Sequence, residues 1–226
     1  MNELFELEDV DSDGAIRETA EAVDPQTRAA FLKKAGLGGA AIMGSGAVLG
    51  LLPSIASAAA FPASDIAILK FALTLEYLEA EFYAQAKKNN VGNGNTDLTT
   101  FVNVVSAHEA AHVAFLRNAL GSKALSKPTF DFRDTVTNQQ KFQATAQVLE
   151  DTGVAAYLGQ AGNIKSKKIL GAAASILPVE ARHAAWIRDI NSSFKGTNPM
   201  PAPAAFQGSK TKAQILAAVK GTGFIV

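Results

Sequence analysis

The sequence contains no cysteine, and this absence limits the chemistry that the chain can carry. It excludes disulfides, thiolate metal sites and iron–sulfur clusters. Any transition metal must therefore be held by histidine and carboxylate side chains. Histidine is scarce as well, with three residues in a chain of 226. The positions of these three residues are correspondingly informative.

The chain also lacks a net charge, since 21 basic residues balance 21 acidic ones. The balance hides an asymmetry, because residues 1–26 carry nine acidic side chains and one basic one, whereas residues 59–226 carry seventeen basic and twelve acidic ones. The basic residues are dispersed and form none of the basic-aromatic clusters that are typical of nucleic-acid-binding proteins. We therefore expect no nucleic-acid partner.

Length and composition favour one main globular domain with flanking segments. Apolar residues make up 48% of the chain, which is enough for a sizeable core. We expect an acidic leader and export-signal-like segment at 1–58, a helical domain at 59–195, and a tail rich in proline and glycine at 196–226. A short helix is predicted within this tail at about 210–219.

The segment before residue 59 has the parts of an export signal: a basic stretch ending at Lys34, an Ala/Gly/Leu-rich run at 35–52, and the small-x-small site Ala56-Ser57-Ala58. Its Phe-Leu-Lys core resembles a twin-arginine signal, but Ala29 stands where the second arginine belongs. The pattern predicts a periplasmic, cell-envelope or secreted protein that is cleaved before Ala59. The alternative is an uncleaved anchor, and membrane contact is expected only through this segment.

Hydrophobic periodicity predicts four long helices at about 64–88, 97–120, 137–160 and 166–191. Ser64 is predicted to cap the first. Residues 121–134 should form a long extended crossover between the second and third helices, with Phe130 and Phe132 packed over the bundle. The predicted fold class is all-α, an antiparallel four-helix bundle.

Two of the three histidines follow a glutamate by three residues, in Glu109-Ala110-Ala111-His112 and Glu180-Ala181-Arg182-His183. Residues at i and i+3 lie on one face of a helix, so each pair can direct a carboxylate and an imidazole to one point. Helix bundles hold pairs of metal ions with this motif.

The remaining two helices carry a second repeated pattern. Tyr83 follows Glu76 by seven residues, and Tyr157 follows Glu150 by seven. Each of these helices precedes one with a Glu-x-x-His motif, which indicates a duplicated two-helix unit. Folded together, the four helices would bring four glutamates and two histidines to the bundle axis, which is the ligand set of a carboxylate-bridged di-metal site.

On these motifs, and over about residues 64–191, the chain resembles the ferritin-like superfamily of di-iron and di-manganese carboxylate proteins. It is especially similar to the exported group that includes desiccation-related proteins. The resemblance implies two Fe or Mn ions, with Glu109 and Glu180 as bridging ligands. It assigns the remaining ligands to the two ions separately, Glu76 and His112 to one, Glu150 and His183 to the other.

The resemblance also implies redox chemistry with oxygen or peroxide: oxidation of ferrous iron, or peroxide reduction or dismutation. The resemblance is compatible with iron and with manganese. It is also compatible with a single chain and with a homo-oligomer. The competing hypothesis is a non-catalytic bundle with a structural or vestigial metal site, acting in the cell envelope or in protection against desiccation.

Four further residues are expected next to the ligands. Glu79 lies one helical turn from Glu76 and is expected to replace it as a ligand or to contact the ligands. Tyr83 and Tyr157 are predicted to donate hydrogen bonds to ligand carboxylates. His108 is expected beside the site.

His108 also permits a different interpretation. His108-Glu109-Ala110-Ala111-His112 is the zinc-protease signature, in which two histidines bind zinc and the glutamate activates water. That signature requires a third ligand and leaves the motif at Glu180 unexplained, so we favour the di-metal hypothesis.

Overall fold

The computed structural model describes residues 61–195 and 200–226. The described part contains five α-helices and no strand, so the predicted all-α class is confirmed. The helices are α4 (Ala63–Lys88), α5 (Thr96–Leu120), α6 (Gln139–Ala161), α7 (Lys167–Lys195) and α8 (Lys212–Thr222). Two short 3-10 turns, η3 (Gly121–Lys123) and η4 (Arg133–Val136), lie in the crossover. The leader and export signal predicted at 1–58 lie outside the described residues.

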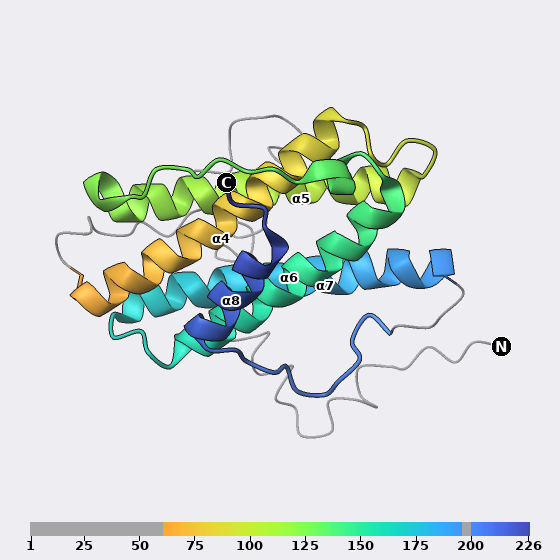
Figure 1. Cartoon of the computed structure of the whole chain (residues 1–226). Helices are drawn as coiled ribbons and strands as arrows, with labels where there is room; N and C mark the ends of the chain where they lie inside the picture. The colour runs from red at the N-terminus through yellow and green to blue at the C-terminus, as the bar shows by residue number, and fades with distance from the viewer. Residues whose placement is uncertain (1–60, 196–199) are drawn as a thin grey trace, which may run out of the picture. The chain divides into compact units, whose positions relative to one another are not determined.

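The four long helices form the predicted antiparallel bundle (Figure 1). Helix α4 packs along α5, and α6 packs along α7, so that two helical hairpins result. The hairpins meet through contacts of α4 with α6 and of α5 with α7. The long crossover predicted between the second and third helices joins them. No helix in the described residues is both long and apolar enough to cross a membrane.

Local sequence explains where the helices begin. Asn95 and Asn138 cap α5 and α6, and their side chains accept hydrogen bonds from the backbone N–H groups of Leu98 and Lys141, each at 3.0 Å. The predicted cap of the first helix is wrong. The carbonyl of Pro62 already accepts the N–H groups of the first turn, so Ser64 lies inside the helix rather than before it.

A buried carboxylate joins the start of α7 to α4. Asp65 lies on α4 with no exposed surface, and its two oxygens accept the backbone N–H groups of Lys165 and Ser166 at 3.1 and 2.8 Å. The first N–H groups of a helix lack partners within the helix. Asp65 provides partners for donors just before α7, and it thereby connects the two hairpins.

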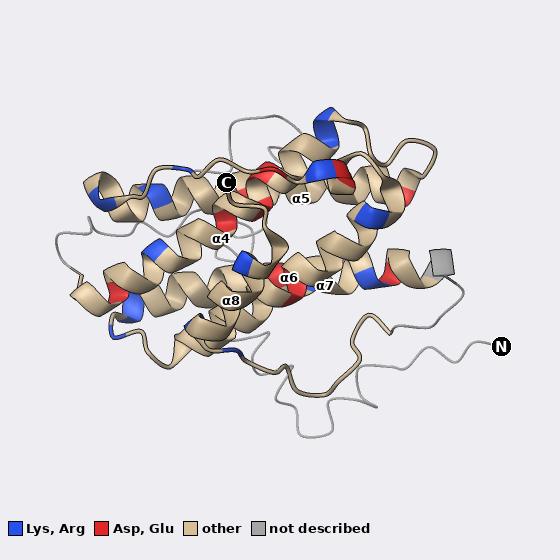
Figure 2. Cartoon of the chain, viewed as in Figure 1, with Lys and Arg blue, Asp and Glu red and all other residues tan. Residues whose placement is uncertain are grey.

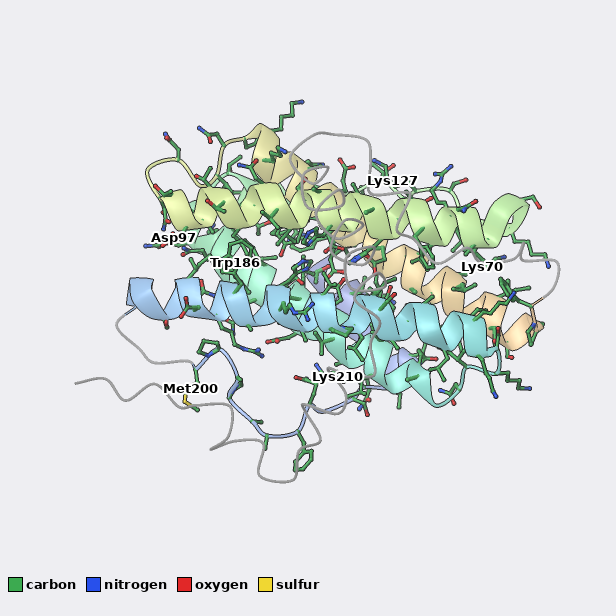
Figure 3. All side chains as sticks on the ribbon, turned by 180° about the vertical axis from the view of Figure 1, so that it is seen from behind. Lys70, Asp97, Lys127, Trp186, Met200 and Lys210 are labelled. Carbon is green, nitrogen blue, oxygen red and sulfur yellow. The ribbon has the colours of Figure 1, made fainter. Side chains whose placement is uncertain are left out.

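Aromatic side chains fill the bundle on one side of its middle. The rings of Phe82 and Phe142 stack at 5.1 Å, and Phe132 from the crossover packs edge-on against Phe82. Phe130 stacks on Phe132 at 5.5 Å, which confirms that both crossover phenylalanines cover the bundle. Trp186 extends from α7 toward α5, where its ring meets Phe101 at 5.4 Å (Figure 3).

The C-terminal segment packs on the bundle and on the crossover. The N–H of Lys210 donates to the carbonyl of Ala155 on α6, and the predicted short helix is present as α8. Beyond α8, the N–H of Asp131 donates to the carbonyl of Phe224, and the N–H of Val226 donates to the carbonyl of Thr129. The last residues therefore hold the crossover in place.

Candidate metal centre

Four glutamates meet in the middle of the bundle, one from each long helix. They are Glu76, Glu109, Glu150 and Glu180, and none has exposed surface. Figure 2 shows acidic residues near the middle of α4 and of α6, away from the helix ends. Burying four carboxylates together is unfavourable unless cations or protons compensate their charge.

His112 directs one nitrogen toward three of these carboxylates. Its Nδ1 lies 2.9 Å from Glu180 Oε1, 3.3 Å from Glu76 Oε2 and 3.3 Å from Glu109 Oε2. A single N–H can donate well to only one of the three oxygens. This convergence on one point is the arrangement that a metal ion requires of its ligands.

His183 repeats this arrangement on the other side of the same carboxylates. Its Nδ1 lies 3.2 Å from Glu109 Oε1, 3.4 Å from Glu150 Oε2 and 3.7 Å from Glu180 Oε2. The two imidazole rings are 6.5 Å apart between centroids. The two histidines therefore face the central carboxylates from two adjacent points.

The described residues contain two overlapping groups whose ligand atoms all lie within 4.8 Å of one another. The first group comprises Glu76, Glu109, His112 and Glu180, and the second comprises Glu109, Glu150, Glu180 and His183. The two residues that belong to both groups are the two that the resemblance assigns as bridges. The structure thus brings together all six predicted ligands, while their binding of metal stays a prediction.

The donor atoms themselves fit divalent cations. Six buried atoms in these groups have no hydrogen-bond partner, namely Glu76 Oε2, Glu109 Oε1, Glu150 Oε2, both oxygens of Glu180, and His183 Nδ1. A buried polar atom without a partner costs about 1–3 kcal/mol, and more when it is charged. Carboxylate oxygens together with imidazole nitrogens suit Fe or Mn.

Without a cation, burial favours the protonated form of some of these carboxylates. Burial and the charges of Glu180 and Glu76 raise the pKa of Glu109 well above its ordinary value. Burial also raises the pKa of Glu150 to about 7, although the nearby His183 opposes this rise. Without metal, protons therefore compensate part of the negative charge.

The histidines accept some of these protons. Burial opposes a charge on His112, but Glu76 and the other nearby carboxylates outweigh it and raise the His112 pKa far above its ordinary value. For His183, burial is likewise outweighed, mainly by Glu109 and Glu150, and the pKa rises to about 12. Metal ions must displace protons from these groups when they bind.

The two tyrosines of the repeat bond across the bundle. The hydroxyl of Tyr83 on α4 donates to Glu150 Oε1 on α6, and the hydroxyl of Tyr157 on α6 donates to Glu76 Oε1 on α4. These are the hydrogen bonds predicted from the sequence. Burial, together with these glutamates, raises the pKa of both tyrosines, so the hydroxyls stay protonated and hold the carboxylates in place.

His108 lies beside the site rather than in it. Its Nδ1 is 2.9 Å from Nε2 of His183, the two rings stack at 5.2 Å, and His108 belongs to neither metal-binding group in the described residues. Burial and the adjacent His183 lower the His108 pKa to about 4, so this imidazole is neutral and accepts the N–H of His183. Because His108 does not converge with His112, the geometry does not favour the zinc-protease interpretation.

Glu79 is buried next to the proposed ligands. Burial, followed by the charges of Glu150 and Glu180, raises its pKa well above the ordinary value. Its carboxylate lies beside Gly153, where an added Cβ would be 3.3 Å from Glu79 Oε1. The helical patterns described above do not predict this role of Gly153. The repeat could have revealed it, because Gly153 follows Glu150 by three residues just as Glu79 follows Glu76.

Comparison with known families agrees with this geometry. The family model of the ferritin-like domain matches residues 64–193. This range covers the four long helices apart from their outermost residues. No curated protein matches the sequence. With the family match, the helical bundle and the paired Glu-x-x-His motifs in agreement, the chain belongs to the ferritin-like family.

Proposed function

We propose that this protein holds two Fe or Mn ions and carries out redox chemistry with oxygen or peroxide, either oxidising ferrous iron or removing peroxide. The observation that supports the proposal most directly is the set of unpartnered, buried ligand atoms that converge on two adjacent points. Uncharged residues would pack such a core at lower cost, so the cost of burying these atoms has a direct explanation in metal binding.

The proposed ligands divide between the two positions. Glu76 and His112 would hold one ion and Glu150 and His183 the other, while Glu109 and Glu180 would contact both. A bound pair of Fe or Mn ions would supply the redox chemistry toward oxygen or peroxide.

The protein residues orient the ligands and exclude water. The hydroxyls of Tyr83 and Tyr157 fix one oxygen of Glu150 and of Glu76, which leaves the other oxygen of each carboxylate free. Around Tyr83 the rings of Phe82, Phe101 and Phe142 are fully buried and exclude water from this side of the site. A dry site of this kind strengthens electrostatic interactions with bound ions.

Metal analysis tests the proposal. Protein purified without chelator, or loaded with Fe(II) without air, should contain about two Fe or Mn ions per chain. The double variant Glu109→Ala/Glu180→Ala should lose both ions, because these residues belong to both groups. Glu81→Ala is the matched control, since Glu81 lies on α4 with its carboxylate on Lys127 and outside both groups.

Activity is then measured as oxygen consumption with ferrous iron and as loss of peroxide. Wild-type protein that binds no metal after anaerobic loading would contradict the proposed site. Protein that binds the ions but is inactive in both assays would instead support a structural role. Circular dichroism on every variant ensures that loss of metal does not reflect loss of the helices.

The location of the protein is a separate part of the proposal. The export-signal pattern before Ala59 supports a protective role outside the cytoplasm. Sequencing the N-terminus of exported material should give a chain that starts near Ala59. An intact Met1 in that material would contradict cleavage.

A further inference from the structure

The two halves of the repeat differ in what surrounds their tyrosines. Around Tyr83, three phenylalanines fill the bundle. The ring of Tyr83 lies 5.3 Å from that of Phe82, 5.8 Å from that of Phe101 and 5.9 Å from that of Phe142. All of these side chains are fully buried, so this side of the site is closed.

Around Tyr157, alanines stand in the places of two of these three rings, and Ile68 stands in the place of the third, Phe142. The residue before Tyr157 is Ala156, where Phe82 precedes Tyr83, and the residue eight before Glu180 is Ala172, where Phe101 stands eight before Glu109. The missing rings leave a pocket of about 30 Å³. Its lining includes Ala72, Leu116, Ala156, Tyr157, Ala172 and Ile176.

The pocket lies one helical turn from the first metal-binding group. Ala72 precedes Glu76 by four residues, Leu116 follows His112 by four, and Ile176 precedes Glu180 by four, so each pair shares a helix face. Tyr157 forms part of the pocket wall while its hydroxyl donates to Glu76. Toward the surface the lining includes half-buried residues such as Ile68, Ile164 and Ala173.

The lining determines which molecules can enter. It is almost entirely hydrocarbon, and its polar side chains are Gln160 and Tyr157, whose hydroxyl is already bonded to Glu76. Peroxide would lose hydrogen bonds to water on entry, which is costly. The volume exceeds the roughly 10–15 Å³ that a cavity needs to hold one water molecule and is far below the roughly 150 Å³ of a cavity that holds benzene, so the pocket suits a molecule of a few atoms and not a hydrocarbon chain.

We infer that this pocket admits dioxygen to the first metal position and that dioxygen, rather than peroxide, is the oxidant that enters by this route. The inference deepens the proposed redox function and rests on it. It also explains the broken symmetry of the repeat, because alanines in place of Phe82 and Phe101 open a path on one side of the site only.

The first experiment uses xenon as a probe of the pocket in the full chain prepared without metal. Apolar cavities bind xenon, so wild-type protein should bind it, and xenon NMR or xenon-pressurised crystals should detect it. Ala172→Val adds two methyl groups inside the pocket and should abolish the signal. Ala156→Val is an independent second variant, in case the first does not fold. Ala174→Val is the matched control, because Ala174 is exposed on the same helix.

The second experiment compares oxidants in metal-loaded protein. Ala172→Val should slow oxidation by dioxygen several-fold, while oxidation by peroxide and the metal content match those of Ala174→Val. Wild-type protein that binds no xenon would overturn the inference, and so would a valine variant that excludes xenon but reacts with dioxygen at the wild-type rate. Failure of the proposed function would be distinct, because it would appear as absent metal in protein that still binds xenon.

Discussion

Gly153 shows how the absence of one side chain affects the whole site. It lies on α6 one turn after Glu150, and Glu79 of α4 occupies the space beside it. A Cβ at this position would approach Glu79 Oε1 to 3.3 Å and Glu180 Oε2 to 3.8 Å. The glycine therefore makes room for a fifth buried carboxylate next to the proposed ligands.

We expect Gly153→Ala to weaken metal binding about tenfold, the lower end of the effect of disturbing groups next to metal ligands. The new methyl group would displace the carboxylate of Glu79, whose charge acts on that of Glu180. Without metal the variant should be at least as stable as wild type, because alanine favours a helix over glycine by about 1 kcal/mol. Isothermal titration with Mn(II) and thermal unfolding of the metal-free protein measure the two effects.

Gly171→Ala is the matched control, because Gly171 lies in α7 with no atom within 4 Å of an added Cβ. This variant should gain stability and keep the wild-type affinity for metal. If Gly153→Ala binds Mn(II) as tightly as Gly171→Ala does, the space beside Gly153 has no importance for the site.

At the scale of the elements, Asp65 makes a polar connection between the two hairpins outside the proposed metal centre. Its buried carboxylate on α4 accepts two backbone N–H groups immediately before α7. Glu76 on one hairpin and Glu180 on the other belong to the same group. The two hairpins must therefore be aligned along the bundle axis for these carboxylates to meet. Asp65 therefore helps to set the register between the hairpins.

Asp65→Ala should lower the free energy of unfolding by about 2 kcal/mol, because it leaves two backbone donors without their partner. Asp65→Asn keeps one acceptor oxygen and should recover part of the loss. Asp97→Ala is the control. Asp97 is exposed in the first turn of α5, where an acidic residue contributes about 0.5 kcal/mol through the helix dipole. Urea denaturation of the metal-free proteins measures all three, and equal losses for Asp65→Ala and Asp97→Ala would contradict the argument.

The sequence was sufficient to predict the helices because their signals are local. Apolar periodicity locates the four long helices, and the spacing of Glu109 and His112 within one turn needs no knowledge of the other helices. Contacts between elements are a different matter. The hydrogen bonds of Asp65 to the start of α7 join residues about one hundred positions apart, and no local pattern marks them.

The site itself was partly predictable for the same reason. The repeat identified the six proposed ligands and the two tyrosines, since each half carries the same residues at the same spacing within each helix. It did not reveal the stacking of His108 on His183, nor the pocket beside Tyr157. These features depend on how side chains of different helices fill space. The repeat nevertheless contains a signal for the pocket, in the alanines that replace Phe82 and Phe101.

At the scale of the whole molecule, the buried charges determine how stability depends on pH. The pKa of Glu150 rises from an ordinary 4.5 to about 7 on folding, and that of His183 from 6.5 to about 12. Between the unfolded and folded pKa values, the folded state binds more protons than the unfolded state does. Folding stability must therefore fall as the pH rises through these ranges.

Glu180 behaves in the opposite sense, but in a different pH range. Burial tends to raise its pKa, yet the nearby His112 and His183 lower it to about 2. Its contribution to stability is present above pH 4.5 and is lost only in acid, as the pH falls toward 2. It therefore does not offset the effects of Glu150 and His183 near neutral pH.

Metal-free protein should consequently melt several degrees lower at about pH 8 than at about pH 5, with most of the fall above pH 6.5, because below this pH the lowered pKa of His108 opposes the effect of Glu150. Protein loaded with Mn(II) should show the reverse trend, because the ions replace the protons and bind more tightly as these groups lose them. Differential scanning calorimetry at a series of pH values, with and without Mn(II), measures both trends. Glu109→Ala/Glu180→Ala should remove the stabilisation by Mn(II) at every pH. Parallel pH profiles for the metal-free and metal-loaded proteins would mean that the ions do not bind where the buried protons lie.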